Sequence, residues 1–420
     1  MQKGTKTRLI SHQILFKIRE NNINFDEAFD INILQHKMLE SDKKMIHNIV
    51  LSSMRYHLHI EKIIPMYAKK KVTTNQYILL LSAITQIIFL NFKNYAVVNS
   101  SVDVAKIIKI FPGFINAILK NIIKDKEKLR GIKIDYNDLP DWFIKKNKDL
   151  SKKEKELFLN TIIEKPSLHL VFKNKSCINK FRYEHIKSSD VSLVIKKQAL
   201  IKNLPRYLEG EWWVQDYAVM LPIYLMENIN NKKIIDMCSA PGGKSFQILS
   251  LNNNIKLIEI NKTRALILQE NLNRLNFKTT IDITNSLEIS ELQKYDIVII
   301  DAPCSSIGTI RRNPEIFFRN QNPNLNEKLL LQKKLLDKAK KIIKKKGVII
   351  YMVCSFFPSE TTEQVKKFLK ENTNFELSKF KTKDEDDELI DSNGCINILP
   401  KVYRDFNIDG FFAAKLINND

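Results

Sequence analysis

Three strand-like segments in the second half of the chain end in residues that can do chemistry. The first, IIDM, runs into the glycine loop CSAPGGKS at 238–245. The second, YDIVIID, ends in Asp301 with Cys304 just behind it, and the third, GVIIYMV, delivers Cys354. In an open parallel sheet the carboxyl ends of the strands border the ligand crevice. We therefore expect a glycine loop, a carboxylate and two thiols to converge in one crevice.

The histidine distribution limits the chemistry that these thiols can perform. The last histidine is His185, so the half of the chain that carries the motifs has none. Ser-His-Asp and Cys-His hydrolases need an imidazole base to activate their nucleophile. Those enzyme classes are therefore excluded, and the thiols must serve a reaction in which histidine is dispensable.

The glycine loop does not match the known nucleotide motifs. A P-loop needs a glycine five residues before GK, where this chain has Cys238, and the pattern GxGxxG is also absent. What remains is a strand, a glycine turn and a helix start, whose backbone amides can bind a carboxylate or a phosphate. Glu259 ends the next strand-like run, where an acidic side chain can accept both hydroxyls of a ribose. A nucleoside without a pyrophosphate fits both features, and S-adenosylmethionine is such a ligand.

Composition places the chain among globular intracellular proteins. At 420 residues it is long enough for two or three domains, and no apolar run reaches the roughly 18–20 residues of a membrane span. The stretch MQKGTKTRLISHQ lacks the apolar core of a signal peptide. Five cysteines without regular spacing indicate reduced thiols and no zinc site. We expect a cytoplasmic protein with no membrane and no metal, and a monomer by default.

The charge of the chain points toward a polyanionic partner. The formal net charge is +21 at pH 7, which favours nucleic-acid binding. Lysine, isoleucine and asparagine are all abundant, so part of the basicity also fits a genome with biased base composition. Lys69, Lys70 and Lys71 could contact phosphate, although a lysine run is more often a solvated face.

Periodicity divides the chain into a helical part, a mixed part and an alternating part. Residues 1–135 are helical, since Leu9, Ile10, Ile14, Leu15 and Ile18 recur at helical spacing. Residues 136–230 are mixed, with strands predicted in 167–174 and 192–197 and an apolar helix after Trp212, Trp213, Gln215 and Asp216. From 231 onward strands and helices alternate, which is typical of a doubly wound parallel sheet. Helices are predicted at 244–251, 262–276, 326–346 and 359–371, the acidic run 384–388 as a solvated loop, and DGFFAAKL as an antiparallel closing strand.

The motifs resemble one family of enzymes. DMCSAPGGK, EINKTR, DAPCSSIGTIRRNPE, YMVCS and DGFFAAKL together are similar to the RNA (cytosine-C5) methyltransferases. VVNSSVDVAK at 97–106 and PGFINAILKNI at 112–122 resemble the later helices of a NusB-like RNA-binding domain. This combination is most similar to the bacterial small-subunit (16S) rRNA enzymes of the Sun/RsmB type. The resemblance implies an all-α NusB-like domain at 1–135, a connecting subdomain at 136–230 and a Rossmann-like methyltransferase domain at 231–420.

The resemblance also implies a cofactor site for S-adenosylmethionine. Glu259 is expected to hold the ribose, and Asp301 to lie beside both the cofactor and the target base. The family usually has aspartate where this chain has Asn285, which keeps an acceptor oxygen for the adenine but loses the charge. The loop expected to hold the methionine end of the cofactor consists of Cys238, Ser239, Ala240, Pro241, Gly242, Gly243 and Lys244.

The chemistry of cytosine explains why two thiols are present. Carbon 5 is a poor nucleophile, and a thiolate that adds to carbon 6 makes the ring enamine-like, so that carbon 5 can attack a methyl group. The resemblance assigns Cys354 as the nucleophile and Cys304 to release of the methylated base, while Asp301 can hydrogen-bond the ring edge. The reverse assignment stays open, because a Pro-Cys dipeptide carries the nucleophile in DNA cytosine methyltransferases. Two small buried strand cysteines without a role are the other alternative.

The RNA substrate follows only from the resemblance. It points to cytosine 967 of small-subunit rRNA, with another rRNA site, a tRNA site, a non-catalytic ribosome-assembly factor and an NTP-binding protein as alternatives. Arg311 and Arg312, the only adjacent arginines, are predicted to contact RNA, or else to keep the surface soluble. Cys177 and Cys395 have no comparable context and are predicted to be incidental. The base must leave its stack to reach Cys354, which favours an unpaired RNA site.

Overall fold

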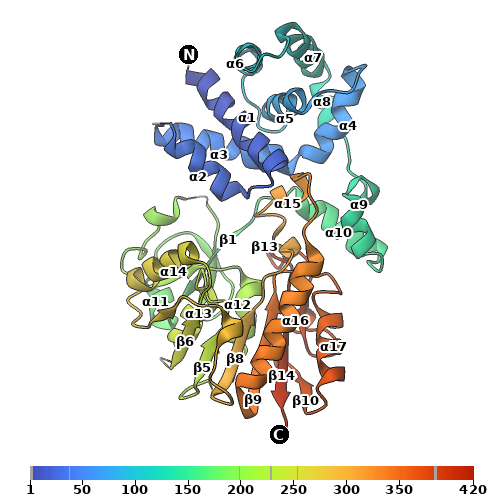
Figure 1. Ribbon diagram of the computed structural model, residues 1–420. Helices are drawn as coiled ribbons and strands as arrows, with labels where there is room; N and C mark the ends of the chain where they lie inside the picture. The colour runs from blue at the N-terminus through green and yellow to red at the C-terminus, as the bar shows by residue number, and fades with distance from the viewer. Residues whose placement is uncertain (1–2, 37, 198, 228, 253, 383–385) are drawn as a thin grey trace. The chain divides into compact units, whose positions relative to one another are not determined.

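The computed structural model describes residues 3–36, 38–197, 199–227, 229–252, 254–382 and 386–420. The chain divides into two compact units (Figure 1). The helical unit comprises Met1–Glu164 and Ile310–Pro323, and the sheet unit comprises Lys165–Thr309 and Asn324–Asp420. Residues 136–164 of the expected connecting subdomain thus lie in the helical unit, and the rest lie in the sheet unit. The three-part division at 135 and 230 stays a prediction.

The helical unit is built from amphipathic helices around one apolar core. Ile10, Ile14, Leu15 and Ile18 of α1 are at most 1% exposed, so the predicted stripe is the buried face of the first helix. The N-terminal part is therefore helical, as predicted. The helices are α1 (Lys3–Asn21), α2 (Phe25–Leu34), α3 (Glu40–Arg55), α4 (His57–Tyr67), α5 (Thr74–Ile88), α6 (Asn94–Ile107), α7 (Pro112–Lys124), α8 (Lys126–Arg130), α9 (Asp141–Lys146) and α10 (Lys152–Ile162).

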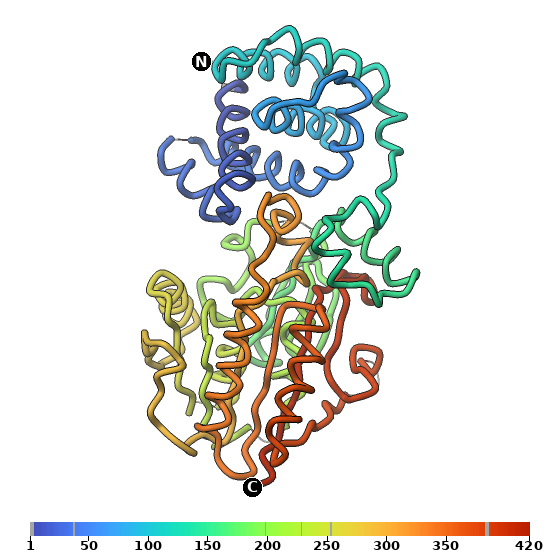
Figure 2. Tube along the Cα trace, turned by 45° about the vertical axis from the view of Figure 1, so that its right-hand side comes forward, coloured from blue at the N-terminus to red at the C-terminus, as the bar shows by residue number. Residues whose placement is uncertain are grey.

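A segment from the Cys304 region of the chain completes this helical core. Ile310–Pro323 folds as part of the helical unit, and its short helix α15 (Glu315–Phe318) packs against α1 and α3 (Figure 2). Phe318 is fully buried in the apolar core, and Arg19 Nη1 donates a hydrogen bond to its carbonyl oxygen at 3.2 Å. The helical unit is therefore complete only with a segment that follows it far along the chain.

The sheet unit begins with a small antiparallel sheet in the strand order β2-β3-β1-β4. Its strands are β1 (Leu168–Phe172), β2 (His185–Lys187), β3 (Ser192–Ile195) and β4 (Trp212–Val214), with helix α11 (Lys175–Lys180) after β1. Both strands predicted between 167 and 197 are present. Trp212 and Trp213 are buried core residues. Asp216 caps the apolar helix α12 (Tyr217–Tyr224) by accepting a hydrogen bond from Ala218 N.

The main sheet has the alternating architecture that the sequence predicts. Its strand order is β10-β14-β9-β8-β5-β6-β7, with β11 paired to β14. The pairings of β5 with β6 and β8, of β6 with β7 and of β8 with β9 are parallel, whereas β14 is antiparallel to β9, β10 and β11. The strands are β5 (Ile234–Asp236), β6 (Ile255–Ile258), β7 (Ile281–Asp282), β8 (Tyr295–Asp301), β9 (Ile343–Val353), β10 (Phe375–Ser378), β11 (Ile396–Ile398) and β14 (Phe411–Asn418). A separate hairpin joins β12 (Lys401–Tyr403) and β13 (Phe406–Ile408).

Helices cover both faces of this sheet, so its strands are apolar on both sides. One face packs against α16 (Leu325–Ile342) and α17 (Thr362–Glu371), through Val298 and Ile300 of β8. The other face packs against α12, α13 (Gly243–Leu249) and α14 (Lys262–Arg274), through Ile297 and Ile299 of the same strand. Successive side chains of β8 therefore pack into two apolar cores, one on each face of the sheet. This explains why the run 297–300 is apolar at every position.

The predicted helix 326–346 is too long at its end. Helix α16 stops at Ile342, and Ile343 already pairs with Tyr295 of β8. The next paired residue of β9 is Val348, so the residues between form a bulge in which Lys346 has φ +56°. A Cβ atom on Gly347 would lie 2.6 Å from Ile343, so only glycine fits there. The basic run IKKKG thus turns into the sheet instead of extending the helix.

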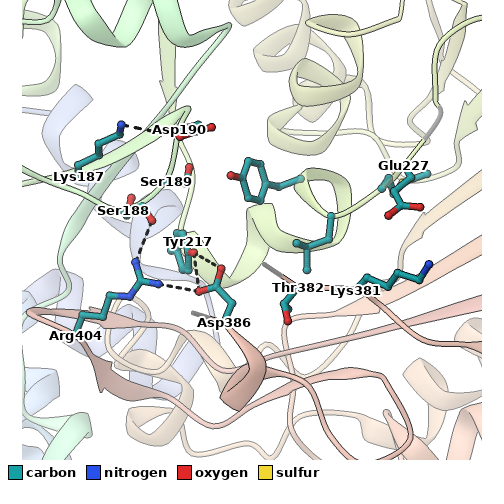
Figure 3. Close-up of a pocket in the computed structure, with 13 residues that line it drawn as sticks. Lys187, Ser188, Ser189, Asp190, Tyr217, Glu227, Lys381, Thr382, Asp386 and Arg404 are labelled. Atoms are coloured by element: carbon teal, nitrogen blue, oxygen red, sulfur yellow. Dashed lines mark hydrogen bonds and ion pairs between the residues drawn. The ribbon is translucent and has the colours of Figure 1, made fainter. Parts of the chain in front are cut away.

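The acidic run at 384–388 is only partly a solvated loop. Residues 384 and 385 lie outside the described residues, and Asp387 and Glu388 are exposed, as predicted. Asp386 is 7% exposed, which contradicts the prediction for this residue. Its carboxylate accepts hydrogen bonds from the Tyr217 hydroxyl at 2.9 Å and from Arg404 Nη2 at 3.2 Å (Figure 3). The Tyr403 hydroxyl also donates to this carboxylate, at 2.6 Å. Burial is possible because these donors replace the water that the carboxylate loses.

Within the described ranges, no helix is both long enough and apolar enough to cross a bilayer.

Candidate active site at the carboxyl edge of the parallel sheet

The register of the main sheet brings the ends of its central strands together. Asp236, the last residue of β5, is the Cα partner of Leu257 in β6 and of Ile299 in β8. Asp301, the last residue of β8, is the partner of Met352 in β9. The loops that carry the sequence motifs therefore leave the same edge of the sheet. This is the edge that borders the ligand crevice in open parallel sheets, beside the point where the strand order reverses.

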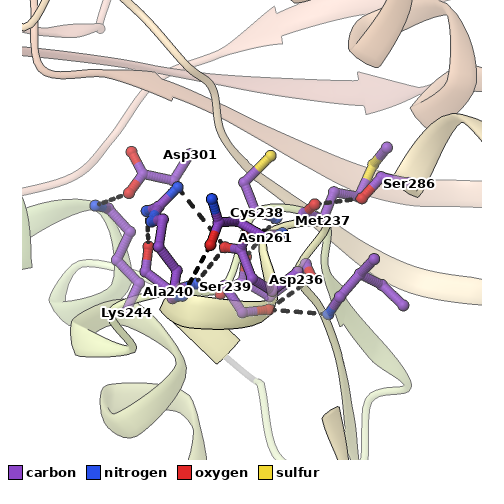
Figure 4. Close-up of polar contacts among 12 residues, drawn as sticks. Asp236, Met237, Cys238, Ser239, Ala240, Lys244, Asn261, Ser286 and Asp301 are labelled. Atoms are coloured by element: carbon purple, nitrogen blue, oxygen red, sulfur yellow. Dashed lines mark hydrogen bonds and ion pairs between the residues drawn. The ribbon is translucent and has the colours of Figure 1, made fainter. Parts of the chain in front are cut away.

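The glycine loop after β5 needs its glycine at position 242. Gly242 has φ +115°, and a Cβ atom there would lie 2.1 Å from the Phe246 ring. Ser239 fastens the start of the loop, because its backbone N donates to Ile258 O and its hydroxyl donates to Asp236 O, at 3.0 and 2.9 Å (Figure 4). The loop is thus fixed between β5 and β6 by its own backbone and by one serine.

Asp236 stabilises this loop through hydrogen bonds to its side chain. Its carboxylate accepts hydrogen bonds from Ser245 Oγ at 2.7 Å and from Cys238 N at 3.2 Å. Complete burial raises the pKa of Asp236 to about 6, which is opposed by the hydrogen bond from Ser245. Burial, together with the charges of Asp236 and Asp301, raises the pKa of Cys238 far above its usual value. Cys238 is therefore a protonated thiol, in keeping with its prediction as an unreactive loop residue.

Glu259 closes the other side of the loop. It is 2% exposed and accepts hydrogen bonds from Ala240 N at 3.3 Å and from Asn261 N at 2.9 Å. Arg264 Nη1 lies 3.7 Å from the Glu259 carboxylate, and Arg264 Nη2 donates to the Ala240 carbonyl oxygen. Arg264 belongs to the EINKTR motif but was not predicted as a site residue. It joins Glu259 to the glycine loop, a role that spacing alone does not reveal.

Asn285 follows the next strand, β7. Its side-chain oxygen accepts a hydrogen bond from Leu287 N at 3.0 Å, and the neighbouring Ser286 hydroxyl donates to Met237 O. Ile260 directly follows Glu259 in the chain, and Ile283 lies two residues before Asn285. Their side chains are 66% and 51% exposed. Two large apolar side chains are therefore available for a flat ligand beside Glu259 and Asn285.

Lys244 and Asp301 form an ion pair at the centre of this edge. Lys244 Nζ lies 2.6 Å from Asp301 Oδ2, and their side chains are 8% and 25% exposed (Figure 4). Burial alone would lower the pKa of Lys244, but the negative charges of Asp301 and of the Cys354 thiolate outweigh burial and raise this pKa above its usual value. The same attraction favours the thiolate of Cys354, because an ammonium group nearby stabilises a thiolate.

The two cysteines lie in contrasting surroundings. Cys354 is the first residue after β9 and is half-buried, whereas Cys304 is 8% exposed. Burial, followed by the charges of Cys354 and Glu360, raises the pKa of Cys304 well above its usual value. The sequence predicted that both thiols reach one crevice. The structure adds that a cation faces Cys354, while anionic groups face Cys304.

A close backbone approach connects three of the motifs. Gly308 of the Cys304 loop donates its N–H to Cys354 O at 3.1 Å, and its carbonyl accepts from Gly410 N at 2.8 Å. A Cβ atom on Gly308 would lie 1.9 Å from Gly410 O. The glycines in the motifs SSIG and DGFF are therefore required because these two loops touch through their backbones.

Arg311 does not sit on the surface. It is 1% exposed in the helical unit, its Nη1 lies 3.6 Å from Glu164, and its carbonyl accepts a hydrogen bond from Arg55 Nη2 at 2.8 Å. In this structure its guanidinium is not available to RNA phosphate, because it is buried against protein. Arg312 is exposed, so the predicted RNA contact is carried forward for Arg312 alone.

Three buried polar residues behind the two cysteine loops were not predicted from the sequence as site residues. Glu360 and Ser355 are fully buried, and Gln332 is fully buried on α16. The one sequence signal for them is a polar residue beside a short apolar run, such as Gln332 after three leucines. Across the described part of the chain, no group of three His, Cys, Asp or Glu side chains is arranged to hold a metal ion.

Comparisons with known proteins fit this architecture. The model of a family described as 16S rRNA methyltransferase RsmB/F matches residues 223–417, and the model of the NusB family matches residues 5–124. The ribosomal RNA small subunit methyltransferase B of Shewanella oneidensis is 27% identical over 98% of each chain. The protein of that name from Photorhabdus laumondii is 26% identical over 91% of this chain and 92% of its own.

The fold itself has a solved counterpart. The crystal structure of PH0851 covers 99% of each chain with a TM-score of 0.74 and 20% identity. The predicted combination of a NusB-like helical domain with a Rossmann-like methyltransferase domain is therefore confirmed. The NusB model matches the first part of the chain, the RsmB/F model matches the second part, and relatives align along almost the whole length, so the chain is similar to the 16S rRNA methyltransferases of the RsmB/F family and fits an rRNA methyltransferase.

Proposed function

We propose that this rRNA methyltransferase transfers a methyl group from S-adenosylmethionine to carbon 5 of a cytosine in small-subunit rRNA. The observation that carries the proposal is the convergence of Lys244, Asp301, Cys304 and Cys354 at one sheet edge. Methylation of a nitrogen or an oxygen needs no covalent activation of the base. A pair of thiols beside a lysine is understandable where carbon is the acceptor, because a thiolate must first activate the ring.

The residues around the glycine loop fit S-adenosylmethionine. Bound there, the cofactor supplies an electrophilic methyl group on a positively charged sulfonium. Glu259 offers a nearly buried carboxylate for the ribose hydroxyls, and Asn285 offers amide groups for the adenine edge. Ile260 and Ile283 offer apolar faces for the adenine ring. The residues proposed to hold the cofactor are Cys238, Ser239, Ala240, Pro241, Gly242, Gly243, Lys244, Glu259, Asn285 and Asp301.

Cys354 is assigned the attack on the base. Its thiolate adds to carbon 6 of the cytosine, the ring electrons move toward carbon 5, and N3 takes a proton or a hydrogen bond from the site. Lys244 favours the thiolate, and Asp301 is placed to hydrogen-bond the ring edge while it holds Lys244. Carbon 5 would then take the methyl group as the bond from that group to the sulfonium breaks and leaves its electrons on the cofactor sulfur. The product is an adduct that carries both the methyl group and the Cys354 sulfur.

Cys304 is assigned to the breakdown of this adduct. The proton on carbon 5 leaves, its bonding pair restores the ring double bond, and the carbon–sulfur bond breaks with its electrons returning to Cys354. Cys304 serves this step as base or proton relay. Its raised pKa keeps it as a thiol near neutral pH, so as a relay it takes the carbon-5 proton while its own proton passes to solvent, and it is unsuited to the first attack.

The RNA partner is proposed from the family and from charge. The target is cytosine 967 of small-subunit rRNA or, failing that, another rRNA or a tRNA cytosine, presented outside its stack. Among the polar residues of the helical unit, exposed Arg312 and exposed Lys69, Lys70 and Lys71 are the proposed phosphate contacts. Bisulfite sequencing of rRNA from cells with and without the gene identifies the base. If cytosine 967 is equally protected in both, the site assignment is wrong although the reaction can stand.

The assignment of the two thiols is tested with alanine variants. Cys354→Ala cannot form the carbon–sulfur bond, so neither methylated RNA nor a covalent complex should appear. Cys304→Ala should still attack and methylate, then accumulate as a protein–RNA adduct that survives denaturing electrophoresis. Cys177→Ala, at a cysteine outside the site, is the control and should behave as the unmodified protein.

Three outcomes would contradict this proposal in different ways. An adduct that accumulates with Cys354→Ala but not with Cys304→Ala would place the nucleophile on the Pro-Cys turn. Transfer of labelled methyl groups to small-subunit RNA by the Cys354→Ala, Cys304→Ala double variant would show that no thiol is needed, and a carbon acceptor would then be ruled out. A non-catalytic assembly factor would give no label with any form of the protein.

A further inference from the structure

Glu360 is a buried carboxylate behind the two cysteine loops. It is fully buried at the turn between β9 and α17, and its carbonyl oxygen accepts a hydrogen bond from Tyr351 OH at 2.7 Å. Burying an ionised carboxylate is costly unless hydrogen bonds or a cation compensate. Among the described residues, Glu360 has hydrogen-bond donors but no lysine, arginine or histidine at ion-pair distance. Within these residues the carboxylate is thus held by neutral hydrogen-bond donors and by no cation.

The donors to this carboxylate come from the loop that carries Cys304. Ser305 N donates to Glu360 Oε1 at 2.8 Å, and the Ser305 hydroxyl donates to Oε2. Gln332 Nε2 of α16 lies 3.1 Å from Oε1 and 3.1 Å from Pro303 O, so it braces the same loop from the other side. The residues on both sides of Cys304 thus depend on Glu360 or on its partner Gln332.

The loop that follows Cys354 joins the same network. Ser305 Oγ lies 3.2 Å from Ser355 Oγ, and Ser355 Oγ accepts a hydrogen bond from Phe357 N at 3.1 Å. Glu360 N in turn donates to Phe357 O at 2.9 Å. One carboxylate therefore fixes the residue after each cysteine, which sets the spacing between the two thiols.

The charge of Glu360 also distinguishes the thiols. After burial and the charge of Cys354, the charge of Glu360 is the next cause of the raised pKa of Cys304. Cys304 also faces Asp301, another anion, whereas Cys354 faces the ammonium of Lys244. The anions around Cys304 disfavour its thiolate, and the cation beside Cys354 favours the other one.

We propose that Glu360 is a positioning residue of this site, whose buried carboxylate ties the two cysteine loops together and whose negative charge keeps Cys304 from competing with Cys354 for the attack. The inference rests on the proposed function only where it names the attacking thiol. A carboxylate that merely fills a polar hole would fix the loops as well. It would not make the reactivity of Cys304 depend on the charge at position 360, and this difference can be measured.

The test compares variants that change charge and length separately. Glu360→Gln keeps the size and one acceptor oxygen, replaces the other oxygen with an NH2 group that can donate to the Ser305 hydroxyl, and removes the charge. Glu360→Asp keeps the charge on a shorter side chain. Glu363→Gln, an exposed residue of α17, is the matched control. In the full-length protein without RNA or cofactor, iodoacetamide labelling of Cys304 and Cys354 is followed by peptide mass spectrometry from pH 6 to pH 10.

The expected result is specific to one thiol and one variant. Glu360→Gln should shift the labelling profile of Cys304 to lower pH, so that its rate below the midpoint rises about three- to tenfold. The profile of Cys354 should stay within about twofold, and Glu360→Asp and Glu363→Gln should leave the midpoint of Cys304 unchanged. An unchanged Cys304 midpoint in folded Glu360→Gln overturns the charge role. A parallel change at Cys354 would indicate general loosening and would overturn it equally.

The loop-tying role has its own readout. Amide hydrogen exchange in 303–308 and 354–358 should be accelerated at least tenfold by Glu360→Ala and much less by Glu360→Gln. If Glu360→Ala and Glu360→Gln exchange these amides at the same rate, Glu360 does not tie the two cysteine loops together. Neither experiment involves methyl transfer, so a negative result here is distinct from a failure of the proposed reaction. If the enzyme methylates no cytosine, the thiol profiles still decide what Glu360 does.

Discussion

Lys244 Nζ lies 2.6 Å from Asp301 Oδ2, although the two residues belong to motifs 57 positions apart in the chain. The lysine stands in the first turn of α13 and the aspartate ends β8, so the parallel pairing of β5 with β8 brings them together. The charge of Cys354 adds to that of Asp301 in raising the pKa of Lys244. The buried ammonium of Lys244 thus interacts electrostatically with two anions, the Asp301 carboxylate and the thiolate of the proposed nucleophile Cys354.

We predict that Lys244→Met slows alkylation of Cys354. Without the ammonium, less of the Cys354 thiol is ionised at pH 7.5, so its labelling rate should fall about tenfold. RNA methylation should fall by at least the same factor. Lys262→Met, at an exposed lysine at the start of α14, is the control. Unchanged Cys354 labelling in the folded Lys244 variant would show that the lysine does not activate the thiol.

Asp301→Asn should raise the labelling rate of Cys354 but lower RNA methylation. The variant removes the competing anion, so Lys244 is left to Cys354 and the labelling rate of this thiol should rise. Methylation should nevertheless fall, about 100-fold, because an asparagine is a weaker partner for the protonated ring edge than a carboxylate. Parallel losses of labelling and methylation would instead indicate that Asp301 only holds the fold.

Asn285→Asp is expected to strengthen cofactor binding. The asparagine oxygen is engaged by Leu287 N, whereas a carboxylate has a second oxygen that can accept the adenine amino group. The Kd for S-adenosylmethionine, measured by calorimetry, should decrease about three- to tenfold. Asn276→Asp, an exposed position of the same unit, adds the same charge without this contact. A lower Kd in both variants would assign the gain to net charge and not to Asn285.

Asp236 should make stability depend on pH. Burial raises its pKa from 3.8 to about 6, so the folded protein binds this proton more tightly than the unfolded chain. The stabilising contribution of protonated Asp236 is complete below about pH 4 and is lost as pH rises through about 6. The free energy of unfolding of Asp236→Asn relative to the unmodified protein should therefore increase by up to about 3 kcal/mol over that range. Urea unfolding between pH 4 and pH 7.5 measures it, and a flat difference would contradict the burial effect.

Gly308→Ala should destabilise the site while leaving the helical unit intact. The added methyl group would overlap Gly410 O, which lies 1.9 Å from the ideal Cβ position. Separating the two loops should cost about 2–4 kcal/mol of unfolding free energy and abolish methylation. Gly131→Ala is the control, since its Cβ would meet Lys128 O at an ordinary 3.5 Å. Equal stability of both variants would refute the close approach.

The sequence predicts those features that depend on local pattern. The apolar runs before Asp301 and Cys354, and the alternation of strands with helices, follow from short-range periodicity. Together with the parallel-sheet rule they predict which loops share an edge. Glu259 and the glycine loop are predicted in the same way, because each lies directly at a strand end. For these features the tertiary structure adds distances and shortens the predicted helix 326–346, which ends at Ile342 where β9 begins.

The remaining features depend on partners that are distant in sequence. Whether Arg311 is exposed depends on the packing of 310–323 into the helical unit, which no local pattern indicates. Asp386 lies in an acidic run that looks solvated, yet the Tyr217 and Tyr403 hydroxyls and Arg404 compensate its burial. Glu360 is one polar residue after a strand, and its partners Ser305 and Gln332 are visible only once β8, β9 and α16 are packed.

RNA binding by the helical unit is poorly tested by deletion of that unit. Removing residues 1–135 would expose Phe318 of α15, which is fully buried in the core of that unit. Charge removal in the full-length protein is cleaner: Lys69, Lys70 and Lys71 are exposed and are replaced together by glutamine.

If all three lysines contact phosphate, the slope of log K against log salt should decrease by about two units, because each contact releases a counterion. Replacing Lys366, Lys367 and Lys370, exposed on α17 of the sheet unit, removes the same net charge as a control. A matching loss of slope in both variants would mean that only net charge matters. No loss in the first variant would make the run a solvated face.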